Sequence, residues 1–166
     1  MKERVEGFVN RLIQLAVRED RAALSALRRS LAFAPGTYPP SFPYVEPWTA
    51  GLKDPARRAF YLGAGLFAHN RKHGEGHTLA KALARAKKAR DSESIEKRFL
   101  ALLDAEEDEL GYKLRQIVFL LGEQPLDWAQ LIFDVAHWNS DTRWVQVKWA
   151  KEFYGVGEET EKEEQA

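Results

Sequence analysis

Apolar residues recur along the chain at the spacing of amphipathic helices. The first stripe has members at every third or fourth position and comprises Val5, Phe8, Val9, Leu12, Ile13 and Ala16. Asp20 is a suitable N-cap for a second helix, whose apolar side consists of Leu24, Leu27 and Leu31. The pattern therefore predicts two helices before the first proline of the chain.

The segment APGTYPPSFPYVEPW, residues 34–48, interrupts this pattern. Its prolines and its glycine cannot continue a helix, so we expect a long loop there. A loop of this length that is rich in aromatic residues is more often packed or functional than flexible.

A third helix is expected to begin at Asp54-Pro55, with the aspartate as N-cap and the proline in the first turn. Gly63 and Gly65 lie inside it, and each costs about 1 kcal/mol of helix propensity relative to alanine. That cost is tolerable where another helix packs closely against the glycines.

Gly74 and Gly76 are expected to end the third helix, and Thr78 can cap the next, which runs to about Ala89. Further helices are expected at residues 93–104, 107–121, 125–138 and 142–154. The chain shows no strand pattern and no internal repeat. We therefore predict an all-α fold, a single-domain bundle of about eight helices that spans residues 1–155. The acidic segment 156–166 has too little apolar content to fold and is expected to be disordered.

The composition is that of a soluble globular protein. The chain has 166 residues, of which 45% are hydrophobic and 30% charged, and this length suits one domain with a buried core. No stretch approaches the roughly 18 uninterrupted apolar residues of a membrane span, so we expect no membrane partner. The N-terminus MKERVEGFVN is too charged for a signal peptide, and the chain has no cysteine. We therefore expect a cytoplasmic protein.

The formal net charge of zero conceals an uneven distribution of charge. The segments GVGEETEKEEQA (155–166) and DAEEDE (104–109) are strongly acidic. Residues 71–90, in contrast, contain seven Lys or Arg residues and one acid, Glu75. A neutral total therefore does not exclude a polyanionic partner.

The helix expected after Thr78 carries its basic residues on one side. Lys81, Arg85 and Lys88 lie opposite the apolar stripe. Most charge runs are solvated faces, but such a face usually mixes both signs and forms pairs four residues apart. This helix contains no acid, so it fits either a solvated face or a surface that binds a polyanion.

Other cations and aromatic residues extend the basic surface. Arg28 and Arg29 end the second helix, where positive charge also suits the helix dipole. Arg57 and Arg58 lie in a first turn, the unfavourable end, so they need an external partner or nearby acids. Trp144, Lys148 and Lys151 fall on one helix face, which fits either a stacking surface for bases or partial burial of the tryptophan.

Metal and catalytic sites are disfavoured. His69, His73 and His77 would share one face only if a single helix passed through them, and the intervening Gly-Glu-Gly interrupts it. The acids at 104–109 precede or open a helix, where the dipole favours them. The sequence has no nucleophile motif and no glycine loop for phosphate. We expect a protein that is not an enzyme and that has no metal and no other cofactor.

Several segments, taken in order, resemble the CasB family, the small subunit of the type I-E CRISPR surveillance complex Cascade. The similarity covers about residues 24–154. The segments are LRRS (27–30), YPPSFPYVEPW (38–48), LFAHNRKHGEGHTLAKAL (66–83), IEKRFLALLDA (95–105), LRQIVFLL (114–121), DWAQLIFDVAHW (127–138) and VQVKWAKEFY (145–154).

The resemblance implies an all-α subunit without catalytic activity. Its partners are expected to be the other Cascade subunits, the CRISPR guide RNA, a second copy of the small subunit, and target DNA with its displaced single strand. Guide pairing supplies the sequence specificity, so backbone-directed cations suffice. The positions that carry over from the family are Arg28, Arg29, Arg57, Arg58, Arg98, Arg115 and Arg143.

The remaining candidate residues rest on charge rather than on the family. These are Lys81, Arg85, Lys87 and Lys88. Arg98 lies one turn from Ile95, so a structural ion pair is an alternative to a nucleic-acid contact for it. Two other functions stay open: a stand-alone DNA-binding regulator with a helix-turn-helix at residues 55–89, and a helical adaptor whose cations pair with a protein partner.

Overall fold

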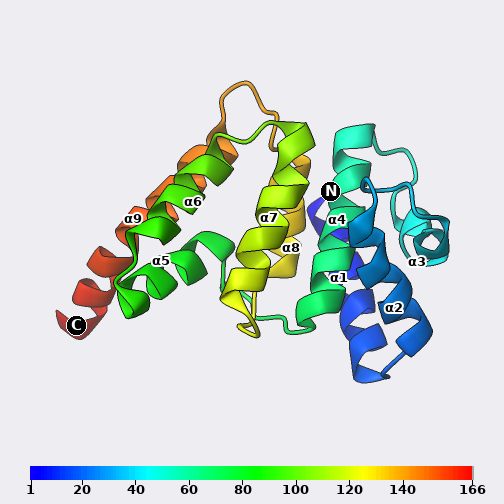
Figure 1. The fold of residues 1–166 in the computed structure, drawn as a ribbon, viewed down its shortest axis with the longest axis horizontal. Helices are drawn as coiled ribbons and strands as arrows, with labels where there is room; N and C mark the ends of the chain where they lie inside the picture. Colours follow the sequence, from blue (N-terminus) through cyan, green and yellow to red (C-terminus); the bar gives the residue numbers. More distant parts are fainter. Residues whose placement is uncertain (166) are drawn as a thin grey trace.

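The protein is all-α, as the sequence predicts (Figure 1). This computed structural model describes the backbone of residues 1–165 and the side chains of residues 1–155. The helices are α1 (Lys2–Val17), α2 (Arg21–Arg29), α3 (Phe42–Val45), α4 (Asp54–Asn70), α5 (Leu79–Arg90), α6 (Glu93–Leu103), α7 (Glu107–Leu121), α8 (Trp128–Ala136) and α9 (Trp144–Gln165). Within residues 1–165 no helix is long and apolar enough to cross a membrane.

Helix α4 lies at the centre of the bundle and packs against α8, α2 and α1. Helices α5, α6 and α9 lie together at one end of the molecule, and α7 and α8 lie between them and α4 (Figure 1). Helix α5 packs against α9 and α6, so the basic helix belongs to this end group. Helix α2 packs against α4 and lies on the side of α4 away from this end group (Figure 1).

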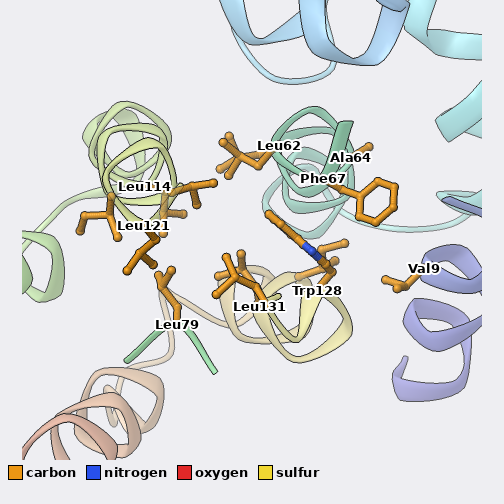
Figure 2. Close-up of a cluster of buried hydrophobic side chains, with 14 of the residues drawn as sticks. Val9, Leu62, Ala64, Phe67, Leu79, Leu114, Leu121, Trp128 and Leu131 are labelled. Atoms are coloured by element: carbon orange, nitrogen blue, oxygen red, sulfur yellow. The ribbon is translucent and has the colours of Figure 1, made fainter. Parts of the chain in front are cut away.

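The core gathers around Trp128, whose side chain is fully buried (Figure 2). Its ring meets Phe67 of α4 edge to face at 5.9 Å, and its indole nitrogen donates to the Lys72 carbonyl at 2.7 Å. Leu62 of α4 and Leu114 of α7 close the same cluster. Burial of this much apolar surface is the main force that holds the helices together.

The two glycines of α4 allow close helix packing, as expected. A Cβ atom on Gly63 would lie 2.6 Å from Cδ1 of Ile132 in α8. One on Gly65 would lie 2.7 Å from Cδ2 of Leu31, just after α2, and 3.0 Å from the Leu27 carbonyl oxygen. The contacts to Ile132 and Leu31 are shorter than real Cβ contacts, so the glycines let α8 and α2 approach the α4 backbone.

Two predicted N-caps are confirmed. The Asp20 side chain accepts a hydrogen bond from the Ala23 amide at 3.1 Å, and Thr78 accepts one from the Lys81 amide at 3.4 Å. The predicted cap at Asp54 is wrong by one residue, because Lys53 is the extended N-cap and Asp54 is already helical.

The predicted end of α4 at Gly74 is also wrong. The helix ends at Asn70, and Arg71 follows in the left-handed conformation with φ of 64°. The buried Asn70 amide donates to the carbonyls of Gly122 and Gln124 at 3.0 and 2.8 Å. Its oxygen accepts from the Lys72 amide at 2.8 Å. These bonds redirect the chain before the glycines are reached.

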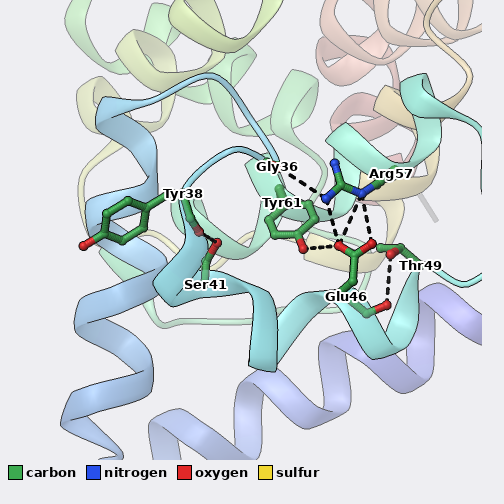
Figure 3. A network of polar contacts seen from close by, with 7 residues as sticks. All are labelled: Gly36, Tyr38, Ser41, Glu46, Thr49, Arg57 and Tyr61. Atoms are coloured by element: carbon green, nitrogen blue, oxygen red, sulfur yellow. Dashed lines mark hydrogen bonds and ion pairs between the residues drawn. The ribbon is translucent and has the colours of Figure 1, made fainter.

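The proline-rich segment is packed, as expected, but it is more regular than a loop. It contains α3 and 3-10 turns at Pro39–Ser41 and Glu46–Trp48, and a third turn, Ser30–Ala32, precedes it. The hydroxyl of Ser41 donates to the Tyr38 carbonyl at 2.7 Å (Figure 3). That of Thr49 donates to the Glu46 carbonyl at 3.0 Å. Prolines fit the first positions of such short turns, which the helical spacing rule does not detect.

The last two helices differ from their predicted ranges. Helix α8 is shorter than 125–138 because the Asp127 side chain caps it, accepting from the Gln130 amide at 3.0 Å. Helix α9 is longer than 142–154, since its bounds are Trp144–Gln165. The predicted disorder of the acidic segment falls on residues whose side chains lie outside the described part, and it stays a prediction.

Candidate nucleic-acid interface

The predicted basic residues do not form one continuous patch. Arg28 and Arg29 end α2, and Arg57 and Arg58 begin α4. The remaining positions lie on α5, α6 and α7 and just before α9, and they are Lys81, Arg85, Lys87, Lys88, Arg98, Arg115 and Arg143. The fold brings some of them together and engages others in internal contacts.

Arg57 is held inside a polar network at the start of α4 (Figure 3). Its guanidinium pairs with the Glu46 carboxylate at 2.9 Å and donates to the Gly36 carbonyl at 3.2 Å. It also lies 4.8 Å from the centre of the Tyr61 ring, and the Tyr61 hydroxyl donates to Glu46. Hydrogen bonds from Arg57 and Tyr61 lower the pKa of Glu46 and so favour its ionised form. This negative charge balances that of Arg57 at the start of α4.

Arg58 is also paired, with Glu107 in the first turn of α7. Nearby acids therefore account for both cations at the unfavourable end of α4, which was one of the two explanations open from the sequence. Both members of the Arg58 pair are more than a third exposed, so the pair contributes little to stability. A phosphate can compete for this guanidinium more easily than for that of Arg57.

Arg28 of α2 and Arg115 of α7 both act electrostatically on His69 of α4, although the three residues come from different helices. Partial burial lowers the pKa of His69, and the positive charges of Arg28 and Arg115 lower it further. The Arg115 guanidinium donates to the Leu31 carbonyl at 3.1 Å and lies 5.2 Å from the centre of the Phe119 ring. We call Arg28, His69, Arg115 and Phe119 the α2–α4–α7 surface.

The His69 imidazole stacks on the Phe119 ring, with centroids 3.9 Å apart and planes 25° apart. Both rings are exposed to solvent, Phe119 to 41%. Sequence reasoning considered His69 only as a metal ligand and did not select Phe119. The available signal was the spacing of four between Arg115 and Phe119, which places a cation beside an aromatic ring on one helix face.

The four cations of α5 differ in their surroundings. Lys87 pairs with Glu96 of α6 at 3.4 Å and approaches the ring of Phe153 at 5.9 Å. Arg85 and Lys88 are exposed and make no ion pair within residues 1–155, while Lys81 is half-buried. The apolar side of α5 faces α9, as the pattern predicts.

Arg98 and Arg143 lie at separate positions of the α6–α9 group. Arg98 is exposed, and the ion pair considered for it is not formed within the described side chains. Arg143 adopts a left-handed backbone with φ of 53° and donates to the Leu103 carbonyl at 2.8 Å. Its guanidinium thus links the start of α9 to the end of α6.

The predicted stacking surface on α9 is mainly structural. Lys148 lies 5.2 Å from the centre of the Trp144 ring but pairs with the buried Asp134 at 2.6 Å. Trp144 is half-buried, as the second explanation required. Lys151 is exposed and has no ion pair among residues 1–155.

A groove of about 730 Å³ runs beside the α2–α4–α7 surface. Arg58, Arg115 and the exposed Tyr112 line it, together with the acids of residues 106–108. The three histidines considered as metal ligands do not form a cluster. His73, in the loop after α4, instead accepts a hydrogen bond from the Trp128 amide at 3.4 Å. No group of three potential metal ligands occurs within the described side chains.

Residues 23–154 match the family described as CRISPR-associated protein Cse2. A protein of that name from Thermus thermophilus is 48% identical over 151 residues, which are 87% of this chain and 88% of that protein. The crystal structure of a Cse2-family protein from the same organism has a TM-score of 0.83 at 45% identity and covers 91% of this chain and 97% of its own.

A chain of a CRISPR RNA-guided surveillance complex shares the fold, with a TM-score of 0.82 at 24% identity, and the match covers 98% of both chains. The family match covers most of the chain, and the relative of the same family is similar over nearly its whole length. The resemblance to CasB found in the sequence is thereby confirmed. The chain belongs to the CRISPR-associated Cse2 family, also called CasB.

Proposed function

We propose that this chain is the non-catalytic small subunit of a type I-E CRISPR surveillance complex in the cytoplasm. In that complex it binds nucleic acid through its basic surface and stabilises both the pairing of guide RNA with target DNA and the displaced strand. Family membership and the fold shared with a surveillance-complex chain support the assembly role. Its partners are the other Cascade subunits, the guide RNA, target DNA and a second small subunit.

The observation that carries the nucleic-acid role is the α2–α4–α7 surface. Arg28 is exposed and Arg115 is half-buried, and they come from separate helices. The Arg115 guanidinium lies near the exposed Phe119 ring, and the charges of both arginines act on His69, which stacks on that ring. Two guanidiniums with like charge gain from a nearby anion, and phosphate, like carboxylate, has a geometry that a guanidinium matches. Contacts of this kind do not depend on base identity, which suits a complex whose guide supplies the specificity.

The regulator alternative has less support from the structure. Residues 71–78 separate α4 from α5, and this connection is longer than the turn of about three or four residues in a helix-turn-helix. Helix α4 is also buried along most of its length. The salt dependence of target-DNA binding distinguishes the adaptor alternative from the proposal, because only phosphate contacts made by this chain would contribute to the salt slope.

The test is reconstitution of the guide-loaded complex with this chain, without it, or with the variant Arg28→Glu/Arg115→Glu. Target-DNA affinity is measured at several salt concentrations. Omission of the chain should weaken binding, and the variant should reduce the slope of log affinity against log salt by about 1.4 to 1.8, since each of the two phosphate contacts contributes about 0.7 to 0.9. The matched control is Lys2→Glu/Lys97→Glu, which reverses two exposed lysines on α1 and α6.

Three outcomes would contradict parts of the proposal. If the chain does not join the complex, the assembly role fails. If the chain joins but its omission changes neither affinity nor salt slope, its cations contact protein rather than phosphate and the adaptor alternative gains support. A loss in the control equal to that in the variant would show a general charge effect rather than contacts at the α2–α4–α7 surface.

A further inference from the structure

The stacked pair of His69 and Phe119 has no role in the core. His69 is the exposed residue in a run of buried ones, since residues 59–68 and Asn70 are all buried. Phe119 is likewise exposed between the buried Val118 and the half-buried Leu120. The pair therefore presents two rings to solvent at the meeting point of α4 and α7.

Two arginines act on these rings. The Arg115 guanidinium lies 5.2 Å from the centre of the Phe119 ring, and the Arg28 charge reaches His69 from α2. A second exposed pair, Phe33 and Tyr38, stacks at 4.8 Å, but no guanidinium or ammonium lies over either of its rings in the described side chains. The first pair thus combines exposed ring surface with the positive charge of two arginines.

We propose that His69 and Phe119 form a stacking site for one nucleobase of a single strand, with Arg28 and Arg115 contacting its flanking phosphates. This inference rests on the proposed function and specifies a subsite within it. A base continues the stack that the two rings begin, and every base presents a π-face, so the site accepts any sequence. The site adds a base-dependent contribution to binding that is otherwise governed by phosphate charge.

The planarity of the ring pair is what the site requires. Aromatic rings and histidine are common stacking partners for unpaired bases. Because the pKa of His69 is lowered, the imidazole is mostly neutral at neutral pH, and it stacks without bringing a third charge beside the two guanidiniums. Substitution of His69 or Phe119 therefore removes stacking surface and leaves the charges of Arg28 and Arg115 in place.

The test compares two ligands for the full-length protein at low salt, oligothymidylate and an abasic DNA oligomer of the same length. The wild type should bind oligothymidylate about 5- to 150-fold more tightly, the range expected for stacking of one base. Phe119→Leu and His69→Ala should each remove most of this preference. Neither should alter affinity for the abasic oligomer or the salt slope, because the guanidiniums remain. The matched control is Phe33→Leu, which removes an exposed stacked ring that has no cation over it.

The outcomes separate this inference from the proposed function. If the wild type binds both oligomers equally with a steep salt slope, the protein binds phosphate but the stacking site does not exist. If Phe33→Leu removes the preference and Phe119→Leu does not, the base stacks elsewhere and the inference is overturned. If neither oligomer binds the free chain, both ligands are tested again on the reconstituted complex. Absence of binding there overturns the inference together with the proposed function.

Discussion

The substitution Gly63→Ala tests whether close packing of α8 on α4 explains the glycine. In an isolated helix, alanine would gain about 1 kcal/mol over glycine. Here the new Cβ would lie 2.6 Å from Cδ1 of Ile132 and would also contact its Cγ1. Ile132 is fully buried, so it cannot move into solvent. Overpacking of this kind costs about 1–3 kcal/mol and more than cancels the propensity gain when the core cannot shift.

We therefore expect Gly63→Ala to lower the free energy of unfolding by up to about 2 kcal/mol, the overpacking cost less the propensity gain. The assay is urea unfolding followed by tryptophan fluorescence, because Trp128 lies in the same part of the core. Gly111→Ala in α7 is the matched control, since its Cβ would lie 3.7 and 3.8 Å from the Leu62 methyl groups, an ordinary contact. The control should raise stability by about 0.5–1 kcal/mol.

A double variant makes the test specific to one contact. Ile132→Ala alone should cost about 2–5 kcal/mol through the cavity that it leaves. With Ile132 shortened, the Gly63 methyl group meets only its Cβ at 3.7 Å and partly fills that cavity. The double variant should therefore be more stable than the sum of the single effects predicts, by at least about 1 kcal/mol. A Gly63→Ala protein as stable as the wild type, or more stable, would refute the reasoning.

Three further predictions concern polar groups. Asp134 is 2% exposed and accepts hydrogen bonds from Gln130, Lys148 and Trp149 at 2.8, 2.6 and 2.7 Å. Asp134→Ala should lower stability by about 2–4 kcal/mol, because the Trp149 indole loses its acceptor, and a loss below about 1 kcal/mol in urea unfolding would contradict this account. The pKa of His69 is lowered from 6.5, so the unfolded chain binds a proton more readily, and protonation below pH 6.5 costs the folded state stability. A His69→Gln variant should lose less stability than the wild type as the pH falls below 6.5, and superimposable curves of unfolding free energy against pH would argue against it. Asp20→Ala should cost about 1 kcal/mol through loss of the α2 cap, and an unchanged melting temperature would show that the cap contributes nothing.

Local sequence signals predicted those parts of the fold that depend on neighbours in the chain. The caps at Asp20 and Thr78 satisfy amides three residues away, so a short motif reveals them. The end of α4 was missed because Asn70 bonds to carbonyls of residues 122 and 124, which only the folded chain brings near. No local rule contains that contact.

The candidate site shows the same limit. Charge reasoning found Arg57 and Arg58, but their partners Glu46 and Glu107 lie on other segments, and only the fold shows that both cations are engaged. His69 was assessed by its spacing to other histidines, whereas its stacking partner Phe119 comes from α7. Family resemblance selected Arg115 for its position, and the structure adds the ring beside it.

The buried Asp134 carboxylate has a mechanical consequence. It joins α8 to α9 through donors from both helices, and the basic helix α5 packs on α9, while α8 packs on the central α4. A shift of α9 must break hydrogen bonds in the interior, where no water replaces them. The α5 cations and the α2–α4–α7 surface are thus kept at a fixed spacing. Under the proposed function, a flexible strand that contacts both the α5 cations and the α2–α4–α7 surface has to adjust its own backbone to the distance between them.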